Sequence, residues 1–174
     1  MDLILDLQLA TEAAAVPSGA RLEHWARAAL DGAGAPDDAA ELTVRIVGAA
    51  EGAALNEQYR GRPGPTNVLS FPFEPPPGFA PEAAAGEHRL LGDLVICAPV
   101  IAREAGEQGK SVEAHWAHMV VHGVLHLLGH DHQASDEAER MEALETAILC
   151  GLGFPPPYEV SPEDSRHPHD ERSI

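Results

Sequence analysis

The segment HGVLHLLGHDH constrains the fold of this chain more than any other part of the sequence. It places His122, His126 and His132 at positions i, i+4 and i+10, with Gly129 between the second and the third. Residues four apart project from one face of a helix, because one turn takes about 3.6 residues. Gly129 can adopt the left-handed conformation that ends a helix and turns the chain. The segment therefore predicts a helix, a sharp turn and three converging imidazoles.

Three neutral imidazoles with one open position are typical of catalytic zinc, whereas structural zinc usually has four ligands, many of them cysteine. The alternative is a buried stripe of histidines, since His115 and His118 precede the motif on the same helical face. Burying such rings without partners would cost about 1–3 kcal/mol each, and a metal relieves part of that cost. We therefore predict one Zn²⁺ per chain on His122, His126 and His132, with His115 and His118 as supporting or packing residues. Copper and nickel also accept imidazole ligands.

Periodicity predicts an α+β fold in which a small mixed four-stranded sheet carries about five helices, with the metal site on a long central helix. We expect strands at residues 2–9, 42–47, 68–73 and 90–98, and helices at residues 18–30, 51–59, 100–108, 111–128 and 135–149. A chain of 174 residues is long enough for one domain, which we place at residues 1–154. Residues 155–174 have no apolar period and predict a disordered acidic tail.

The chain is expected to be cytoplasmic, with no membrane partner. Its first residues are acidic where a signal peptide is basic, and no stretch approaches the ~20 apolar residues of a membrane span. Cys97 and Cys150 are far apart and form no CxxC pair, so they are expected to be reduced.

The net charge of −17 argues against non-specific binding of nucleic acid, which favours a basic surface. It leaves room for a local positive cleft, because charges beyond about 8–10 Å are largely screened at physiological salt. Arg60 and Arg62 lie together in a short segment whose nearest acidic residue is Glu57.

The metzincin proteases share the i, i+4, i+10 spacing but carry a glutamate, their general base, directly after the first histidine. Here that position is Gly123, so peptide hydrolysis by that route is not expected. A metal can still polarise a phosphoryl oxygen, and an arginine fork suits a phosphate. Metal and arginine together favour phosphodiester cleavage, although the sequence alone does not place Arg60 beside the metal.

Three segments in order resemble the YbeY family of bacterial endoribonucleases, from about Leu42 to Leu152: LNEQYRGRPGPTNVLSFPF, LLGDLVICAPVI, and HWAHMVVHGVLHLLGHDH with DEAERMEALE. The resemblance implies zinc ligands at His122, His126 and His132 and a cleft arginine at Arg60 that RNA cleavage needs. It implies single-strand-specific cleavage of RNA, with the 16S rRNA precursor as substrate, in 3′-end maturation and ribosome quality control. Ribosomal proteins or an assembly GTPase are the partners it suggests.

The same resemblance would line the cleft with the VLSFPF strand and the LGD turn, and so put Ser70 and Asp93 near it without an assigned role. The family usually has tyrosine where this chain has His130, which is i+4 from His126. We expect His130 to point away, because the chain leaves the helix at Gly129. Asp131 is a candidate to orient a ligand imidazole or to stabilise the turn. The proline-rich segment 74–88 is enlarged and is expected at the edge of the cleft.

Two functions remain open at this point. The first is a metal-dependent endoribonuclease in which either water or a ribose 2′-hydroxyl attacks phosphorus. The second is a ribosome-assembly or partner-binding factor with a mainly structural zinc, whose acidic surface meets basic ribosomal proteins. The open ligand position favours the first, and the missing general base and the net charge favour the second.

Overall fold

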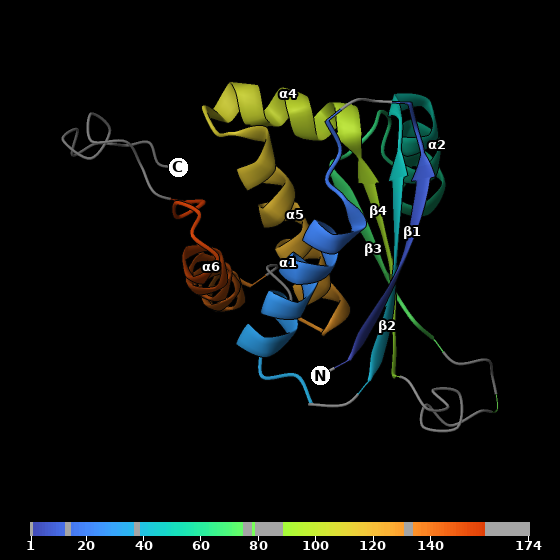
Figure 1. The fold of residues 1–174 in the computed structure, drawn as a ribbon. Coiled ribbons are helices and arrows are strands. Elements are labelled where there is room, and N and C mark those ends of the chain that lie inside the picture. The colour runs from blue at the N-terminus through green and yellow to red at the C-terminus, as the bar shows by residue number, and fades with distance from the viewer. Residues whose placement is uncertain are drawn as a thin grey trace.

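The computed structural model describes residues 2–12, 15–36, 39–74, 78, 89–130 and 134–158. These residues form one α+β domain with a single sheet, which confirms the predicted fold class (Figure 1). Its elements are β1 (Leu3–Ala10), α1 (Gly19–Gly32), β2 (Ala40–Val47), α2 (Ala49–Arg60), β3 (Val68–Pro72), β4 (Arg89–Cys97), α4 (Ala98–Gln108), α5 (Val112–Leu127) and α6 (Ser135–Gly151).

The predictions for the proline-rich segment and for the C-terminal tail fall mostly outside the described residues. The proline-rich segment 74–88 is described only at Glu74 and Gly78, and the predicted tail only at residues 155–158. None of the described helices combines the length and the apolar composition needed to cross a lipid bilayer.

The sheet has the strand order β1-β2-β4-β3. β1, β2 and β4 run parallel, and β3 pairs antiparallel with β4 at the edge. Pro72 ends β3, as expected for a residue that cannot donate to a sheet ladder. Within the described ranges, β3 is therefore an edge strand, with a second side that pairs with no other strand.

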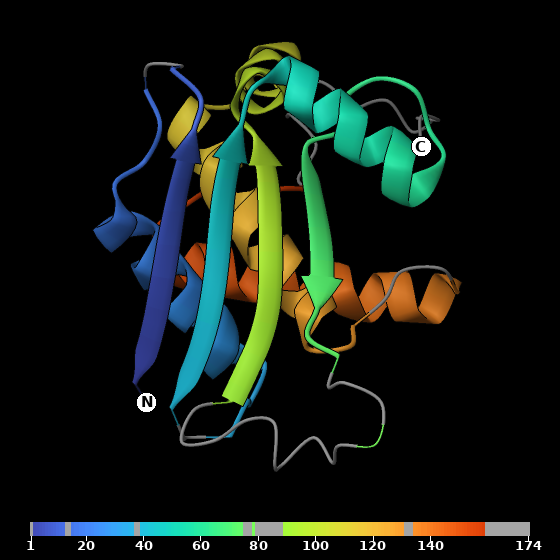
Figure 2. The ribbon, with the colours of Figure 1, turned by 90° about the vertical axis from the view of Figure 1, so that its right-hand side faces the viewer.

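The two faces of the sheet are covered unequally. Figure 2 shows α1, α5 and α6 behind the sheet, with α2 on the opposite side near one end of the strands. The larger core lies between the sheet and the helices behind it, and α5 is buried along most of its length. A smaller cluster with Leu69, Val95 and Cys97 packs near Leu55 of α2 on the other face.

A glycine allows α5 to approach the sheet closely. A Cβ atom at Gly123 would lie 2.8 Å from Leu94 Cδ2 and 3.4 Å from Ser70 Oγ. Gly123 is the position at which the metzincin proteases carry their glutamate. Here that position is buried against β3 and β4, so the side of α5 that could carry such a base is occupied by packing.

We predict that Gly123→Ala destabilises the protein. Alanine gains up to about 1 kcal/mol of helix propensity, but overpacking against the fully buried Leu94 costs about 1–3 kcal/mol. Urea unfolding of the metal-free protein should show a net loss of up to about 2 kcal/mol. The control is Gly106→Ala in α4, where a Cβ meets no atom within 4 Å and should stabilise by about 0.5–1 kcal/mol. Equal shifts in the same direction would contradict the packing argument.

Candidate metal centre and cleft

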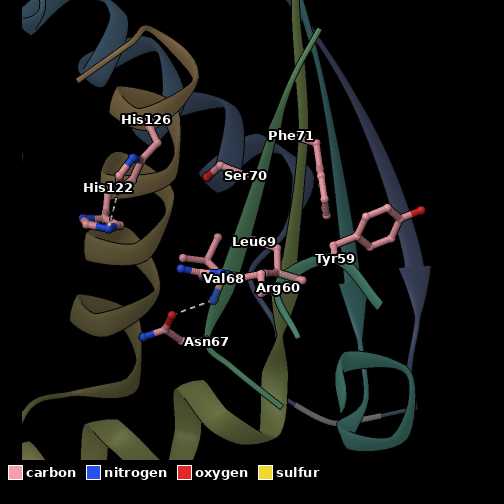
Figure 3. A pocket seen from close by; sticks show the side chains of 9 residues that line it. All are labelled: Tyr59, Arg60, Asn67, Val68, Leu69, Ser70, Phe71, His122 and His126. Carbon is pink, nitrogen blue, oxygen red and sulfur yellow. Dashed lines mark hydrogen bonds between the residues drawn. The ribbon is translucent and has the colours of Figure 1, made fainter. Parts of the chain in front are cut away.

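The C-terminal half of α5 brings two imidazoles together. The Nε2 atoms of His122 and His126 are 3.2 Å apart, and the ring centroids are 4.6 Å apart. Figure 3 shows both rings together on one face of α5. Two nitrogens bound at about 2.05 Å to one tetrahedral zinc lie about 3.3 Å apart. The spacing of these two side chains therefore fits a shared metal ion.

The turn that follows has the predicted form. Gly129 has φ +99°, and its N–H donates to the His126 carbonyl at 3.0 Å. The N–H of His130 donates to the Leu125 carbonyl at 3.0 Å. These two bonds make a Schellman ending, in which a left-handed glycine reverses the chain.

The third predicted ligand, His132, lies outside the described residues, as does Asp131. Among the residues that the structure does describe, no group of three or more His, Cys, Asp or Glu side chains could hold a metal ion. The complete ligand set therefore stays a prediction, with His122 and His126 as the described pair.

A buried glutamate from α6 orients His122, and the sequence did not point to it. Glu145 is 0% exposed, and its Oε2 lies 2.5 Å from His122 Nδ1. A carboxylate accepts hydrogen bonds, so Nδ1 carries the proton and Nε2 keeps its lone pair towards His126. The detectable signal was spacing, since Glu145 shares the i, i+4, i+7 stripe of the buried Met141 and Ile148.

The environment keeps this carboxylate ionised. Burial alone raises the pKa of Glu145, but hydrogen bonds from His118, His122 and Tyr158 outweigh burial and lower the pKa to about 2. His118 Nε2 and Tyr158 Oη lie 3.1 Å and 2.6 Å from Glu145 Oε1. A full negative charge therefore stands behind the His122 ring at neutral pH, as carboxylates do that orient metal-binding histidines.

The two upstream histidines have supporting roles. Lys110 Nζ lies 3.4 Å from His115 Nδ1 and 3.2 Å from His118 Nδ1. His115 Nε2 contacts Glu104 Oε1 at 2.8 Å, whereas His118 reaches Glu145. Burial lowers the pKa of both histidines and of Lys110. Only His118 is linked directly to the carboxylate that orients His122.

A cleft of about 570 Å³ joins the imidazole pair to α2 across the edge of the sheet. Its lining comprises Tyr59, Arg60, Asn67, Val68, Leu69, Ser70, Phe71, His122 and His126. Figure 3 shows the His122 and His126 rings on one side of β3 and the Tyr59 and Phe71 rings on the other. Within the part of the chain that the structure describes, the lining includes an arginine and two histidines and no carboxylate.

Arg60 reaches this cleft from the C-terminal end of α2. The helix ends at Gly61 in the left-handed conformation, with φ +68°. Asn56 is 4% exposed and donates from Nδ2 to the Gly64 carbonyl at 2.8 Å, which ties the following loop to the helix. The structure thus brings Arg60 and the histidine pair to one cavity, a proximity that the sequence alone did not give.

The two strand residues expected near the cleft differ in their placement. Ser70 lines it and donates from Oγ to the Gly123 carbonyl at 3.3 Å, so it joins β3 to α5. Asp93 is exposed and is not among the lining residues. It pairs with Phe71 in the sheet, on the face opposite Ser70, because neighbouring residues of a strand point to opposite faces.

Asn67 closes the cleft at the start of β3. Its Oδ1 accepts from the Val68 N–H at 2.6 Å, and its Nδ2 donates to Glu104 Oε1 at 3.1 Å. The first bond satisfies a backbone donor at the sheet edge, and the second connects the cleft to the Glu104–His115 pair.

Comparisons with known proteins agree with this fold. The family model described as Endoribonuclease YbeY matches residues 8–153. Among solved structures, the chain is similar to the solution structure of TM1509 from Thermotoga maritima, with a TM-score of 0.53 and 21% sequence identity. That match covers 91% of this chain and 98% of the other. At this identity the structural likeness concerns the fold.

The buried position of His115 predicts a pH-dependent stability of the metal-free protein. The unfolded histidine gains a proton below about pH 6.5, whereas burial lowers the folded pKa. The unfolded chain then binds more protons, so the free energy of unfolding should fall as the pH falls below 6.5. His115→Gln should reduce this slope by up to about 1.4 kcal/mol per pH unit in urea unfolding between pH 7.5 and about 5. Identical slopes for both proteins would show that His115 does not titrate on unfolding.

Proposed function

Because the chain belongs to the YbeY endoribonuclease family, we propose that it is a zinc-dependent endoribonuclease that cleaves single-stranded RNA. We assign it to 16S rRNA 3′-end maturation and ribosome quality control in the cytoplasm. The observation that carries the proposal is that Arg60, His122 and His126 line one cleft.

The metal would be held by His122, His126 and His132. When bound, it supplies Lewis-acid stabilisation of charge at phosphorus and makes a bound water more acidic. The 3.2 Å spacing of the two described Nε2 atoms supports this assignment. Zinc is the ion we propose, because three imidazoles with an open position are the donor set of catalytic zinc.

Arg60 binds the phosphate in this proposal. Its guanidinium can donate two parallel hydrogen bonds to a phosphate, and its charge opposes the negative charge that develops at phosphorus. The described residues of the cleft lining include no carboxylate, although the chain as a whole carries a net charge of −17. Local charge therefore favours an anionic substrate at this place on an acidic protein.

The aromatic side of the cleft supports specificity for single strands. The Tyr59 and Phe71 ring centroids are 5.1 Å apart with an interplanar angle of 70°, and Tyr59 is 57% exposed. Unpaired bases stack on exposed aromatic rings, whereas paired bases keep their faces inside the helix. We propose that a base beside the scissile phosphate stacks on Tyr59.

The second candidate is a ribosome-assembly factor with a mainly structural zinc, partnered by ribosomal proteins or an assembly GTPase. The net charge of −17 favours contact with basic proteins. The products of an RNA cleavage assay distinguish the two candidate functions and also the two possible nucleophiles. A cyclic phosphate would indicate attack by the 2′-hydroxyl, a 5′-phosphate would indicate water, and no product at all would favour the assembly factor.

We predict that Arg60→Glu lowers cleavage of a single-stranded RNA by about 100-fold or more, because it replaces a phosphate donor with a repelling charge. The matched control is Arg62→Glu, since Arg62 is exposed two residues later and is not among the lining residues. His126→Ala should lose activity and bound zinc together, and circular dichroism establishes that each variant is folded. Wild-type rates for Arg60→Glu and His126→Ala would refute the nuclease proposal.

A further prediction concerns Tyr59. Tyr59→Ala should weaken binding of single-stranded RNA by about 1–3 kcal/mol, whereas Tyr59→Phe keeps the stacking surface and should bind like wild type. Fluorescence anisotropy with a labelled oligonucleotide measures both variants at a fixed salt concentration. If alanine binds as tightly as phenylalanine, the ring does not stack on a base.

A further inference from the structure

The segment after α6 returns to the buried carboxylate of that helix. Gly153 turns the chain in the left-handed conformation, with φ +97°. The Phe154 ring then packs edge-on against Trp25 of α1 at 6.2 Å, and Tyr158 Oη donates to Glu145 Oε1 at 2.6 Å. The segment is thus anchored at two points, although the sequence predicts a disordered tail from residue 155 onward and the family match ends at residue 153.

Glu145 needs each of its donors, because burying an ionised carboxylate without hydrogen bonds is very costly. Its Oε1 lies within hydrogen-bonding distance of His118 Nε2 and Tyr158 Oη, and its Oε2 of His122 Nδ1. The Tyr158 ring also packs edge-on against His118, with centroids 5.3 Å apart. Tyr158 therefore fixes both the carboxylate and its neighbouring imidazole.

The lysine fixes which atom donates and which accepts in each hydrogen bond of this network. Lys110 Nζ lies 3.2 Å from His118 Nδ1, and a lysine ammonium can only donate. His118 Nδ1 is thus the acceptor, and its Nε2–H donates to Glu145. With Oε1 taken by His118 and Tyr158, Oε2 is left to accept from His122 Nδ1–H. The lone pair of His122 is consequently on Nε2, beside His126.

We propose that Glu145 and Tyr158 are positioning residues of the metal centre: Glu145 fixes the tautomer and the ring orientation of His122, and Tyr158 holds Glu145 in place from the C-terminal segment. This inference rests on the metal site proposed above. The His122 imidazole already has the orientation that the ion requires, so this side chain loses less conformational freedom when the metal binds. The segment 152–158 is then part of the support of the metal centre.

The test measures zinc affinity by competition with a chromogenic chelator, on full-length protein purified without a histidine tag. Glu145→Gln should weaken binding about 10- to 100-fold, the range found when a carboxylate behind a metal-binding histidine is replaced. Tyr158→Phe removes one hydroxyl and should weaken binding by a smaller factor, up to about 10-fold. Glu139→Gln, at an exposed position of the same helix, is the matched control and should bind like wild type.

A double variant tests whether the two residues act as one unit. Because Tyr158 acts through Glu145, adding Tyr158→Phe to Glu145→Gln should weaken binding less than Tyr158→Phe does alone. Full additivity of the two losses would contradict a shared route to His122 and overturn the assignment of Tyr158.

The second readout needs no metal. In metal-free protein labelled with ¹⁵N-histidine, His122 should show the Nδ1–H tautomer in the wild type and a mixture of tautomers in Glu145→Gln. If both single variants bind zinc like wild type and His122 keeps its tautomer, the proposal is overturned. If the wild type binds no zinc, the metal site fails, and the ring-nitrogen shifts alone then decide whether Glu145 fixes His122.

Discussion

Four histidines lie along one buried helix, and each ring nitrogen that is removed from water needs a partner. This constraint organises much of the structure around α5. The ring nitrogens of His115 contact Lys110 and Glu104. Those of His118 contact Lys110 and Glu145, and His122 Nδ1 contacts Glu145. The series ends at the Nε2 atoms of His122 and His126, which face each other at the cleft. The buried polar groups thus satisfy one another's hydrogen bonds, and together they orient the His122 ring.

The cleft depends on β3 being an edge strand. Among the described residues β3 pairs with β4 alone, and the cavity extends from α5 around this edge strand to α2. The cavity therefore has imidazoles on one side and two aromatic rings on the other, and Arg60 belongs to the same lining. A phosphodiester with an adjacent base has the matching chemistry, namely an anion next to a flat apolar surface. No acidic side chain is among the described lining residues, so the net charge was a poor guide to this part of the site.

The helices, strands and turns could be predicted, because they depend on residues that are close together in the sequence. The helix that carries His122 and His126 and its ending at Gly129 follow from helical periodicity and from the left-handed preference of glycine. The mixed four-stranded sheet followed from apolar alternation and from the order of the elements. The observed bounds of these elements lie within about two residues of those expected.

Contacts between distant residues could not be predicted in the same way. The partnership of Glu145 with His122 joins two helices, and only the apolar stripe of α6 pointed to a buried glutamate. Arg60 shares a cavity with the histidines only because α2 and α5 lie on opposite sides of one edge strand. Asp93 was expected near the cleft from its position in a motif, yet it is exposed and is not among the described lining residues, although its sheet partner Phe71 is. His132 lies outside the described residues, so its part in the site is still a prediction.

We propose that one metal ion is held by imidazoles of α5 and the following turn, with a position left open for an oxygen. A crystal structure of the protein grown with one equivalent of zinc would test this. We expect zinc at about 2.0–2.1 Å from Nε2 of His122 and His126, with His132 as the third protein ligand and an oxygen as the fourth. An ion bound by other residues, or imidazole rings that stay without metal, would contradict it.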